Sequence, residues 1–416
     1  MRNRARARYF GDLRSRDHLV SLGMAFGGVF CVIVLRWSWL KPYTTWARLS
    51  LPCYVAGFCV SLWTMGHNRR FRPALWALLL VGTIVVPLGV LLRHEGPRPS
   101  VSAQSEVIVV EQAAVTISNL RNPYTALDPS PELSRLEQPT RDHFPYMPGM
   151  AVLGIARAIT TSRIGDMRLV SVVICGLVVA LFLTPRRRHF ASAIVALPPT
   201  ALIATTGGDD LIVVVLVLVG FAAIHRRSWA QAGLILGVAL ALKQTAWPLV
   251  AVAIVWLATT HTRAIATRVA AIAGGLATIV LAPFLLWNFR SAWEDLVTFP
   301  LHGSHRDVVN SPTVGGLLAR ALGLAESTLS RTMMILVVIA VIWALKQWHL
   351  ETVWHAAALG ASALGAMVLL SPGVRPGLLI YPVIICAWAI FEIRQPDEKA
   401  TSTPLLRGAL GGPGRI

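Results

Sequence analysis

Residues 107–150 read VIVVEQAAVTISNLRNPYTALDPSPELSRLEQPTRDHFPYMPGM. This stretch is rich in charged residues and prolines, whereas most of the remaining chain consists of apolar runs. Polar and ionisable groups are costly in the hydrocarbon core of a membrane, and those that persist near it usually have a function. The contrast predicts a functional loop outside the membrane, carried by a scaffold of membrane-spanning helices.

The composition supports this fold class. The chain has 416 residues, of which 55% are hydrophobic and 14% are charged, and its mean hydropathy is +0.61. Soluble domains carry about a quarter charged residues. Apolar runs of roughly 20 residues, enough to cross a hydrocarbon core of about 30 Å, recur along the sequence. We therefore expect an all-α polytopic membrane protein.

Twelve crossings are expected from these runs. They fall at 19–36, 50–66, 73–92, 168–184, 189–206, 210–225, 229–243, 246–260, 268–288, 331–346, 352–371 and 376–392. The shorter apolar segment 147–160 contains Arg157 and opens with a proline and a glycine, so we interpret it as interfacial or re-entrant. This division predicts a basic N-terminus (1–18), three spans (19–92), an outer loop (93–167), a transmembrane core (168–392) and a disordered tail (393–416).

The net charge of +18 indicates topology rather than nucleic-acid binding, because the basic residues gather in short loops between the runs. Twelve crossings place every tight basic cluster on the cytoplasmic side with both termini. These clusters are Arg69-Arg70, Arg186-Arg187-Arg188, Arg226-Arg227 and the pair Arg263 and Arg268. A full crossing at 147–160 would move Arg186-Arg187-Arg188 outside. The large excess of arginine over lysine is typical of a high-GC genome, so we expect a bacterial plasma membrane.

The cysteines predict neither a disulfide framework nor a metal site. All five lie inside apolar runs, and none shows CxxC or metal-ligand spacing. They are Cys31, Cys53, Cys59, Cys175 and Cys386.

Two glutamates are the candidate catalytic bases. Glu106 and Glu111 fall in an expected surface helix over Ala103–Asn119. Five residues correspond to about 140° of rotation on a helix, so one glutamate would face the site and the other solvent. Glu106 lies closer to the membrane exit and is the preferred base, with Glu111 the alternative. Either could equally be a solvated loop charge.

Two proline-aromatic clusters bracket the middle of the insert, Asn122-Pro123-Tyr124 and His143-Phe144-Pro145-Tyr146. They predict rigid turns that clamp the loop. The rings of Tyr124 and Tyr146 suit the faces of sugars, although anchoring at the lipid headgroups would explain them as well.

Four further charged residues lie at the outer ends of spans. Asp209 and Asp210 open a span after Gly208. Acidic residues are favoured at a helix N-terminus, by its free N–H groups and by the helix dipole. They could bind substrate, or a divalent cation, but two carboxylates alone are a weak metal signal. Lys243 and Arg168 are candidate contacts for a lipid phosphate. Snorkelling to ordinary headgroups is the alternative.

The segment after Phe299 carries His302, His305 and Arg306 within a few residues. Together they could shape an acceptor or phosphate pocket. The two histidines could ligate a metal only with further partners, and the three side chains could also be ordinary polar loop residues.

These features together resemble the GT-C glycosyltransferases, in particular bacterial family 87 and the mannosyltransferases that use polyprenyl-phosphate mannose. Those proteins show an outer loop with an acidic residue, an Ala-Ala helix, an NPY-like break and an aromatic-proline turn, and later an AG-LLG-A--K pattern after a polar turn. The corresponding residues are Glu106, Ala113-Ala114, Asn122-Pro123-Tyr124, Phe144-Pro145-Tyr146-Met147-Pro148, Gly208-Asp209-Asp210 and Ala232 to Lys243.

The resemblance covers about residues 90 to 392 and has two departures. Two extra spans precede the loop, and the acidic residue is glutamate where the family commonly has aspartate. It implies inverting transfer of a mannose- or arabinose-type sugar from a polyprenyl-phosphate donor to a lipid or glycan acceptor of the cell envelope, without metal or other cofactor. A transporter, a flippase for lipid-linked sugars or an inactive relative of the family remain the alternatives.

Overall fold

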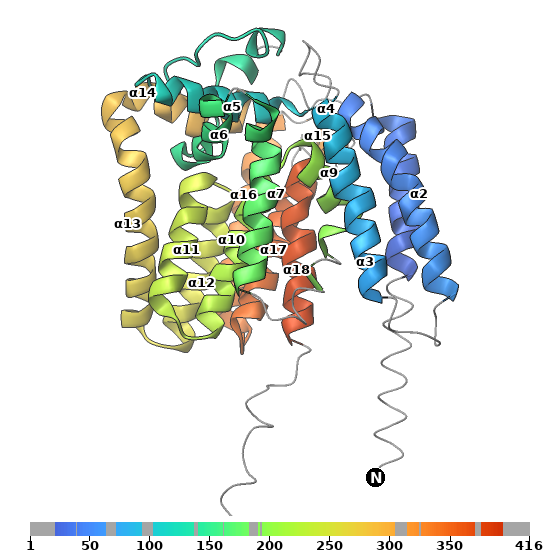
Figure 1. The fold of residues 1–416 in the computed structure, drawn as a ribbon. Coiled ribbons are helices and arrows are strands. Elements are labelled where there is room, and N and C mark those ends of the chain that lie inside the picture. The colour runs from blue at the N-terminus through green and yellow to red at the C-terminus, as the bar shows by residue number, and fades with distance from the viewer. Residues whose placement is uncertain are drawn as a thin grey trace, which may run out of the picture.

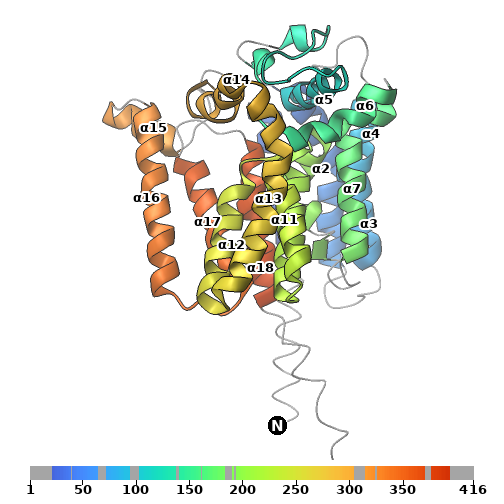
Figure 2. The same cartoon turned by 90° about the vertical axis from the view of Figure 1, so that its left-hand side faces the viewer.

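The computed structural model describes residues 21–38, 40–63, 72–93, 103–136, 140–160, 162–182, 190–191, 194–303, 314–323, 326–370 and 376–393. All regular structure within these residues is helical, which confirms that the fold is all-α. Upright helices form a bundle, and shorter elements lie across one end of it (Figures 1 and 2).

The first half of the chain supplies the loop and the first upright helices. A helix at Ser21–Trp37 precedes α2 (Lys41–Trp63), α3 (Arg72–Leu80), the π-helical turn η2 (Val81–Val85), α4 (Val86–Arg93), α5 (Ser105–Ser118), η4 (Leu133–Arg135), η5 (Thr140–Asp142), η6 (Pro148–Gly154), α6 (Ile155–Thr160), η7 (Arg163–Gly165), α7 (Met167–Phe182) and α9 (Pro198–Thr206).

The second half supplies the core of the bundle. Its elements are α10 (Asp209–His225), α11 (Trp229–Leu242), α12 (Ala246–Thr260), α13 (Arg263–Trp287), α14 (Phe289–Trp293), η8 (Glu294–Gly303), α15 (Val314–Leu322), α16 (Glu326–Gln347), α17 (Val353–Leu370), η9 (Pro376–Leu379) and α18 (Ile380–Ile393).

Three of the described helices are long and apolar enough to cross a membrane: Ala74–Arg93, Arg263–Trp287 and Val353–Leu370. Further apolar helices of 10–17 residues are present, Pro148–Thr160 among them. Helices occur near each of the twelve expected spans, but the number of crossings stays a prediction. The basic N-terminus at 1–18 and nearly all of the tail at 393–416 lie outside the described residues.

One expected span is interrupted. The segment 189–206 is not a single helix, because the chain leaves helical geometry before α9 begins at Pro198. Leu197 has extended backbone angles (φ −60°, ψ 140°), as a residue before proline prefers. The sequence-based prediction overlooked the effect of Pro198-Pro199, which cannot continue a helix from the preceding turn.

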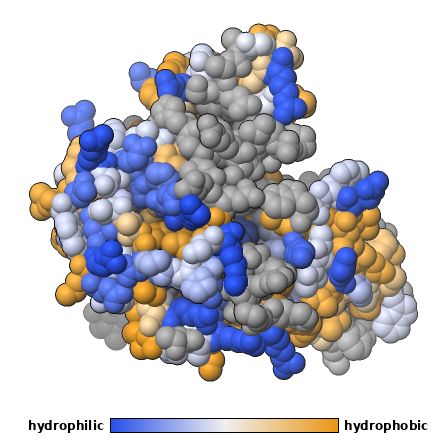
Figure 3. Space-filling view, turned by 90° about the horizontal axis from the view of Figure 1, so that it is seen from above, coloured by the Kyte–Doolittle hydropathy of each residue, from blue (hydrophilic) through white to orange (hydrophobic). Residues whose placement is uncertain are grey.

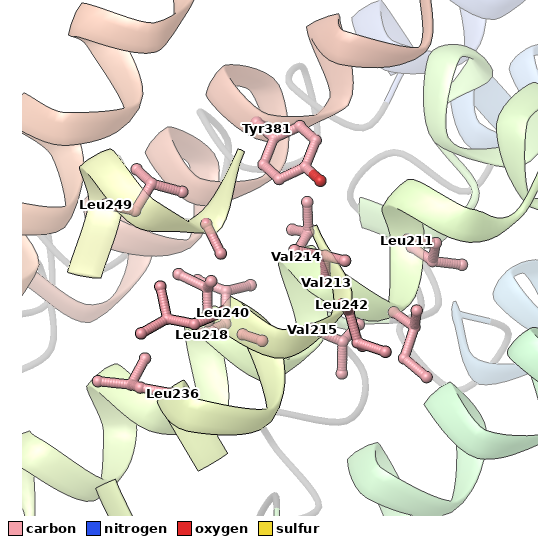
Figure 4. Packing of buried hydrophobic residues seen from close by; sticks show 14 of the residues in the cluster. Leu211, Val213, Val214, Val215, Leu218, Leu236, Leu240, Leu242, Leu249 and Tyr381 are labelled. Carbon is pink, nitrogen blue, oxygen red and sulfur yellow. The ribbon is translucent and has the colours of Figure 1, made fainter. Parts of the chain in front are cut away.

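Helix α10 is the centre of the bundle. Nearly every residue from Asp209 to Ile224 is buried, with Leu216 half-buried. A helix that is hydrophobic all round is expected to be surrounded by other helices. Leucines and valines of α10 and α11 fill the core beneath Tyr381 (Figure 4). The burial of α10 holds its first residues, Asp209 and Asp210, in a fixed place.

Glycines let α11 approach α13 closely. A Cβ at Gly233 would lie 2.7 Å from Ile272 Cβ, and one at Gly237 would lie 3.0 Å from the Ala273 carbonyl oxygen. Small residues four apart are a common device for close helix packing in membranes. The contact fixes the end of α11, from which Lys243 follows.

Two of the basic clusters assigned to the cytoplasmic side lie at the end of the bundle opposite Lys243. Because Lys243 after α11 contacts Asp209 and Asp210 at the start of α10, the intervening loop with Arg226-Arg227 lies at the opposite end. Helix α13 also begins at that end, with Arg263 (Figure 1). These positions fit the predicted sidedness of the loops. Hydrophilic side chains gather among apolar ones on the face that carries the loop (Figure 3).

The loop packs down onto the bundle. The predicted surface helix is present as α5, and the segment 147–160, expected to be interfacial or re-entrant, folds as η6 and α6. A Cβ at Gly149 would lie only 2.5 Å from the Ala241 carbonyl oxygen, and one at Gly154 would lie 2.8 Å from Glu111 Cα. These glycines let η6 fit between α5 and the end of α11.

Gly149→Ala is expected to lower the free energy of unfolding by about 1–3 kcal/mol, because the added methyl group forces backbone apart near Lys243. The measurement is the thermal unfolding midpoint of the purified protein in detergent. Gly89→Ala is the matched control, since a Cβ there meets nothing within 4 Å. Equal midpoints for the two variants would show that η6 is not packed as described.

Candidate active site

Lys243 lies between two aspartates at the loop end of the bundle. Its Nζ donates to Asp209 Oδ2 at 2.7 Å and to Asp210 Oδ1 at 2.6 Å. All three residues are buried, and Asp209 has no exposed surface. A lysine at this depth is costly unless it is paired. The structure thus brings together three residues that the sequence predicted as site residues.

Local backbone geometry produces this contact. Gly208 has a φ of +90°, a left-handed conformation that favours glycine, and α10 starts immediately after it. Asp209 and Asp210 therefore fall in the first turn, as predicted, where the helix dipole favours negative charge. Lys243 follows α11 in extended conformation (φ −154°, ψ 141°), which directs the chain back toward α10.

A tyrosine completes the hydrogen bonds around Asp210. The Tyr381 hydroxyl donates to Asp210 Oδ1 at 2.9 Å, and Thr245 Oγ1 donates to the Tyr381 hydroxyl at 2.6 Å. Asp209 Oδ1 is buried and has no hydrogen-bond partner within the described part of the chain. An unpaired buried acceptor is costly, and a sugar hydroxyl could satisfy it.

The two proline-aromatic clusters meet beside Lys243. The Lys243 Nζ lies 5.2 Å from the centre of the Tyr146 ring, within the range of a cation–π contact. The Tyr124 hydroxyl donates to the Tyr146 carbonyl oxygen at 2.7 Å, and the Tyr124 and Phe144 ring centres lie 5.6 Å apart. The two clusters are therefore in contact, as the predicted clamp of the loop requires, and Tyr146 lies beside Lys243.

Glu106 is placed on the same side as the aspartates. It is buried in the first turn of α5 and interacts electrostatically with Asp210. Gln104 fixes the start of this helix: its Nε2 donates to Thr206 Oγ1 at 3.0 Å and to the Tyr43 hydroxyl at 2.8 Å. The Gln104 amide also donates to the Thr206 carbonyl oxygen at 2.9 Å. The end of α9 thereby holds Glu106 near the start of α10.

Glu111 faces another neighbour. Its Oε1 accepts from the Met167 amide at 2.9 Å, and its Oε2 lies 3.8 Å from Arg157 Nε. The two glutamates therefore point in different directions, as predicted, but Glu111 faces the start of α7 and not solvent. Burial raises the pKa of Glu111 to about 8, with a further increase from Asp166 and opposing effects of the Met167 amide, Arg157 and Arg168.

The raised pKa of Glu111 predicts a pH dependence of stability. Between its ordinary value of 4.5 and about 8 the folded state binds more protons than the unfolded state. Its contribution is therefore complete below about pH 4.5 and is lost as the pH rises through about 8. Glu111→Gln keeps an acceptor for Met167 but has no proton to lose, so its unfolding midpoint is expected to decline less over this range. Parallel pH profiles of variant and wild type would contradict this.

Arg168 is held by a neighbouring carboxylate. Its Nε and Nη2 donate to Asp166 Oδ1 and Oδ2 at 2.9 Å and 2.7 Å, and its side chain has no exposed surface. A Cβ at Gly208 would lie 3.4 Å from Arg168 Cα. Arg168 thus packs behind the turn that precedes Asp209, and a donor phosphate would reach it only after neighbouring groups moved.

Three further predicted site residues belong to the segment after Phe299. The His302 side chain, His305 and Arg306 lie outside the described residues. Within the described part of the chain, no group of three or more His, Cys, Asp or Glu side chains could hold a metal ion. The cation considered at Asp209 and Asp210 therefore gains no support from the geometry.

The structure adds residues that the sequence-based analysis did not assign. Tyr381 and Thr245 complete the Asp210 network, and Gln104 positions α5. Tyr381 could have been noticed from the sequence, because it is a polar side chain inside the apolar run 376–392. Asp166 and Gln104 gave none, because their importance depends on partners distant in sequence.

Comparison with known proteins supplies the family. The model of Glycosyltransferase family 87 matches residues 144–372, which is more than half of the chain. This range contains Lys243, both aspartates, Tyr146 and Arg168, but not Glu106. Neither the comparison with curated proteins nor that with solved structures found a match. The resemblance noted from the sequence is confirmed: the chain belongs to glycosyltransferase family 87 and is a membrane glycosyltransferase.

Proposed function

We propose that the protein transfers a mannose- or arabinose-type sugar from a polyprenyl-phosphate donor to a lipid or glycan acceptor of the bacterial cell envelope. The reaction takes place at the outer face of the plasma membrane, with both termini cytoplasmic. The observation that carries this proposal is the cluster of Glu106, Asp209, Asp210 and Lys243 at one end of an otherwise apolar bundle.

Glu106 is the proposed general base. It takes the proton from an acceptor hydroxyl while that oxygen attacks the anomeric carbon of the donor sugar. The bond from the anomeric carbon to the phosphate oxygen breaks at the same time, and polyprenyl phosphate leaves with the bonding electrons. A single displacement inverts the anomeric configuration, and no metal takes part. Asp209 Oδ1, which is unpaired within the described residues, is a proposed acceptor for a sugar hydroxyl.

Lys243 is the proposed contact for the donor phosphate. An ammonium group has three N–H donors, of which Asp209 and Asp210 use two. The third can offset the charge that builds up on the leaving oxygen. Arg168 was also predicted to bind phosphate. Arg168 is completely buried against Asp166. This position favours a structural role behind Gly208 over direct contact with the donor phosphate.

An apolar pocket supports a lipid donor. Its lining follows α10 from Leu211, the residue after Asp210, to Ala222, and is completed by residues of α7, of α18 and of the segment 191–195. Its lining includes Leu211, Val215, Leu218, Val179, Ile384 and Trp388. Leu211 directly follows Asp210, so a hydrocarbon chain that entered the pocket at this end would have its phosphate end near Lys243.

The test uses purified protein with labelled polyprenyl-phosphate mannose, arabinose and glucose, and octyl α-mannoside as acceptor probe. The expected result is transfer from the mannose or arabinose donor, with a product linkage of inverted configuration by NMR. A product that retains the donor's configuration would contradict the single displacement, and no transfer from any of the three lipid-linked donors would contradict the lipid donor.

A further inference from the structure

A histidine–aspartate pair lies beside the site and has no role in the reaction as proposed. His143 Nδ1 and Asp295 Oδ1 are 2.6 Å apart, and Asp295 Oδ2 accepts from the Phe144 amide at 2.8 Å. Asp295 is buried, which raises its pKa, while His143 and the Phe144 amide act in the opposite direction. Both carboxylate oxygens are thus used to hold the segment that begins at His143.

The pair fixes the orientation of the imidazole. The ring stacks on Phe299, with ring centres 4.2 Å apart and an angle of 21° between the planes. With Nδ1 directed at Asp295, a neutral imidazole donates from Nδ1 and presents Nε2 as an acceptor. Nε2 has no hydrogen-bond partner within the described residues, and the side chain is 23% exposed. A histidine held in this way is prepared to accept a hydrogen bond from an incoming group.

The pair belongs to the same corner of the molecule as Lys243. His143 precedes Tyr146 by three residues, so their Cα atoms are at most about 11 Å apart. The Tyr146 ring covers the Lys243 ammonium group. Gln244 follows Lys243, and its Nε2 donates to the carbonyl oxygens of Pro145 and Leu296, each at 3.4 Å. Hydrogen bonds therefore connect the segment of His143 with that of Lys243.

We propose that His143, held by Asp295, forms part of the acceptor subsite, in which Nε2 accepts a hydrogen bond from a hydroxyl of a saccharide acceptor. This proposal rests on the proposed function. Lys243 is the proposed contact for the donor phosphate, and His143 lies three residues before Tyr146, whose ring covers the Lys243 ammonium group. A saccharide acceptor approaching the donor at this corner would therefore pass close to Nε2. The reacting hydroxyl still loses its proton to Glu106, so His143 is a positioning residue.

Two substitutions separate this role from a purely structural one. His143→Asn keeps an amide nitrogen near the former Nδ1, so the contact with Asp295 can persist while the Nε2 edge is lost. His143→Gln extends to the former position of Nε2 but gives up the Asp295 contact. Asp142→Asn is the matched control, because this neighbouring side chain is half exposed at 50%.

The readout is steady-state transfer from labelled polyprenyl-phosphate mannose to octyl α-mannoside. His143→Asn is expected to raise the KM for octyl α-mannoside roughly tenfold, the effect of losing one hydrogen bond, with a smaller change in kcat and in the KM for the donor. His143→Gln is expected to be less affected. Asp142→Asn is expected to match the wild type.

The proposal would be overturned if His143→Asn had a normal KM for octyl α-mannoside while His143→Gln lost folded protein. That result would mean that the pair of His143 and Asp295 only anchors the loop. Donor cleavage by the wild type without transfer to octyl α-mannoside would also count against the acceptor subsite while leaving the transferase in place. No donor cleavage at all would instead contradict the proposed function itself.

Discussion

Glu106→Gln is expected to reduce the rate of sugar transfer by about 10²- to 10⁴-fold, the usual contribution of a positioned general base. The amide has nearly the same shape as the carboxyl group but cannot accept the proton of the attacking hydroxyl. The start of α5 is held by Gln104 and Thr206, so the variant should fold normally. The measurement is kcat/KM for transfer, together with the thermal unfolding midpoint in detergent.

Glu111→Gln is the matched control for this loss. Glu111 accepts a hydrogen bond from Met167 and lies near Arg157, on another side of the helix from Asp210. Its amide variant can keep the Met167 contact, so transfer should stay within a few-fold of the wild-type rate. If Glu111→Gln loses activity and Glu106→Gln keeps it, the base is Glu111 and the loop must rearrange when substrates bind.

Lys243→Met is expected to lower the free energy of unfolding by about 3–5 kcal/mol, because it leaves two buried carboxylates without their cation. The methionine side chain has a similar length, so the loss reports charge more than volume. The expected measurement is a fall in the unfolding midpoint and in the yield of folded protein. Transfer should be lost as well, since no cation then faces the donor phosphate.

Two companion variants make the cause identifiable. Adding Asp209→Asn to Lys243→Met removes one unpaired charge and should recover part of the lost stability. Lys346→Met changes an exposed lysine of α16 and should leave the midpoint unchanged. A single Lys243→Met variant as stable as the wild type would show that the three buried charges are not in contact.

The sequence predicted the helical class and the surface helix from local signals, and it named most of the residues that the fold brings together in the candidate site. The contrast between polar and apolar stretches located the loop, and the glycine before two aspartates located the start of α10. Rotation along a helix was enough to separate Glu106 from Glu111. These inferences needed no knowledge of which helices are neighbours.

The partners of the charged residues could not be predicted in the same way. Lys243 meets aspartates that lie 34 and 33 residues earlier in the sequence, and Tyr381 meets Asp210 across 171 residues. A lone lysine at a membrane surface suggests a lipid phosphate until its neighbours are known. His143 and Asp295 are likewise 152 residues apart, and only the fold shows that they form a pair.

The most direct test of the central claim is the release of polyprenyl phosphate from labelled polyprenyl-phosphate mannose by the purified protein in lipid vesicles. The account predicts release by the wild type, with transfer of the sugar to an acceptor or to water, and its loss in Glu106→Gln. Intact donor after incubation with each of the mannose, arabinose and glucose forms would contradict it. Movement of the intact donor across the vesicle membrane would then identify a flippase.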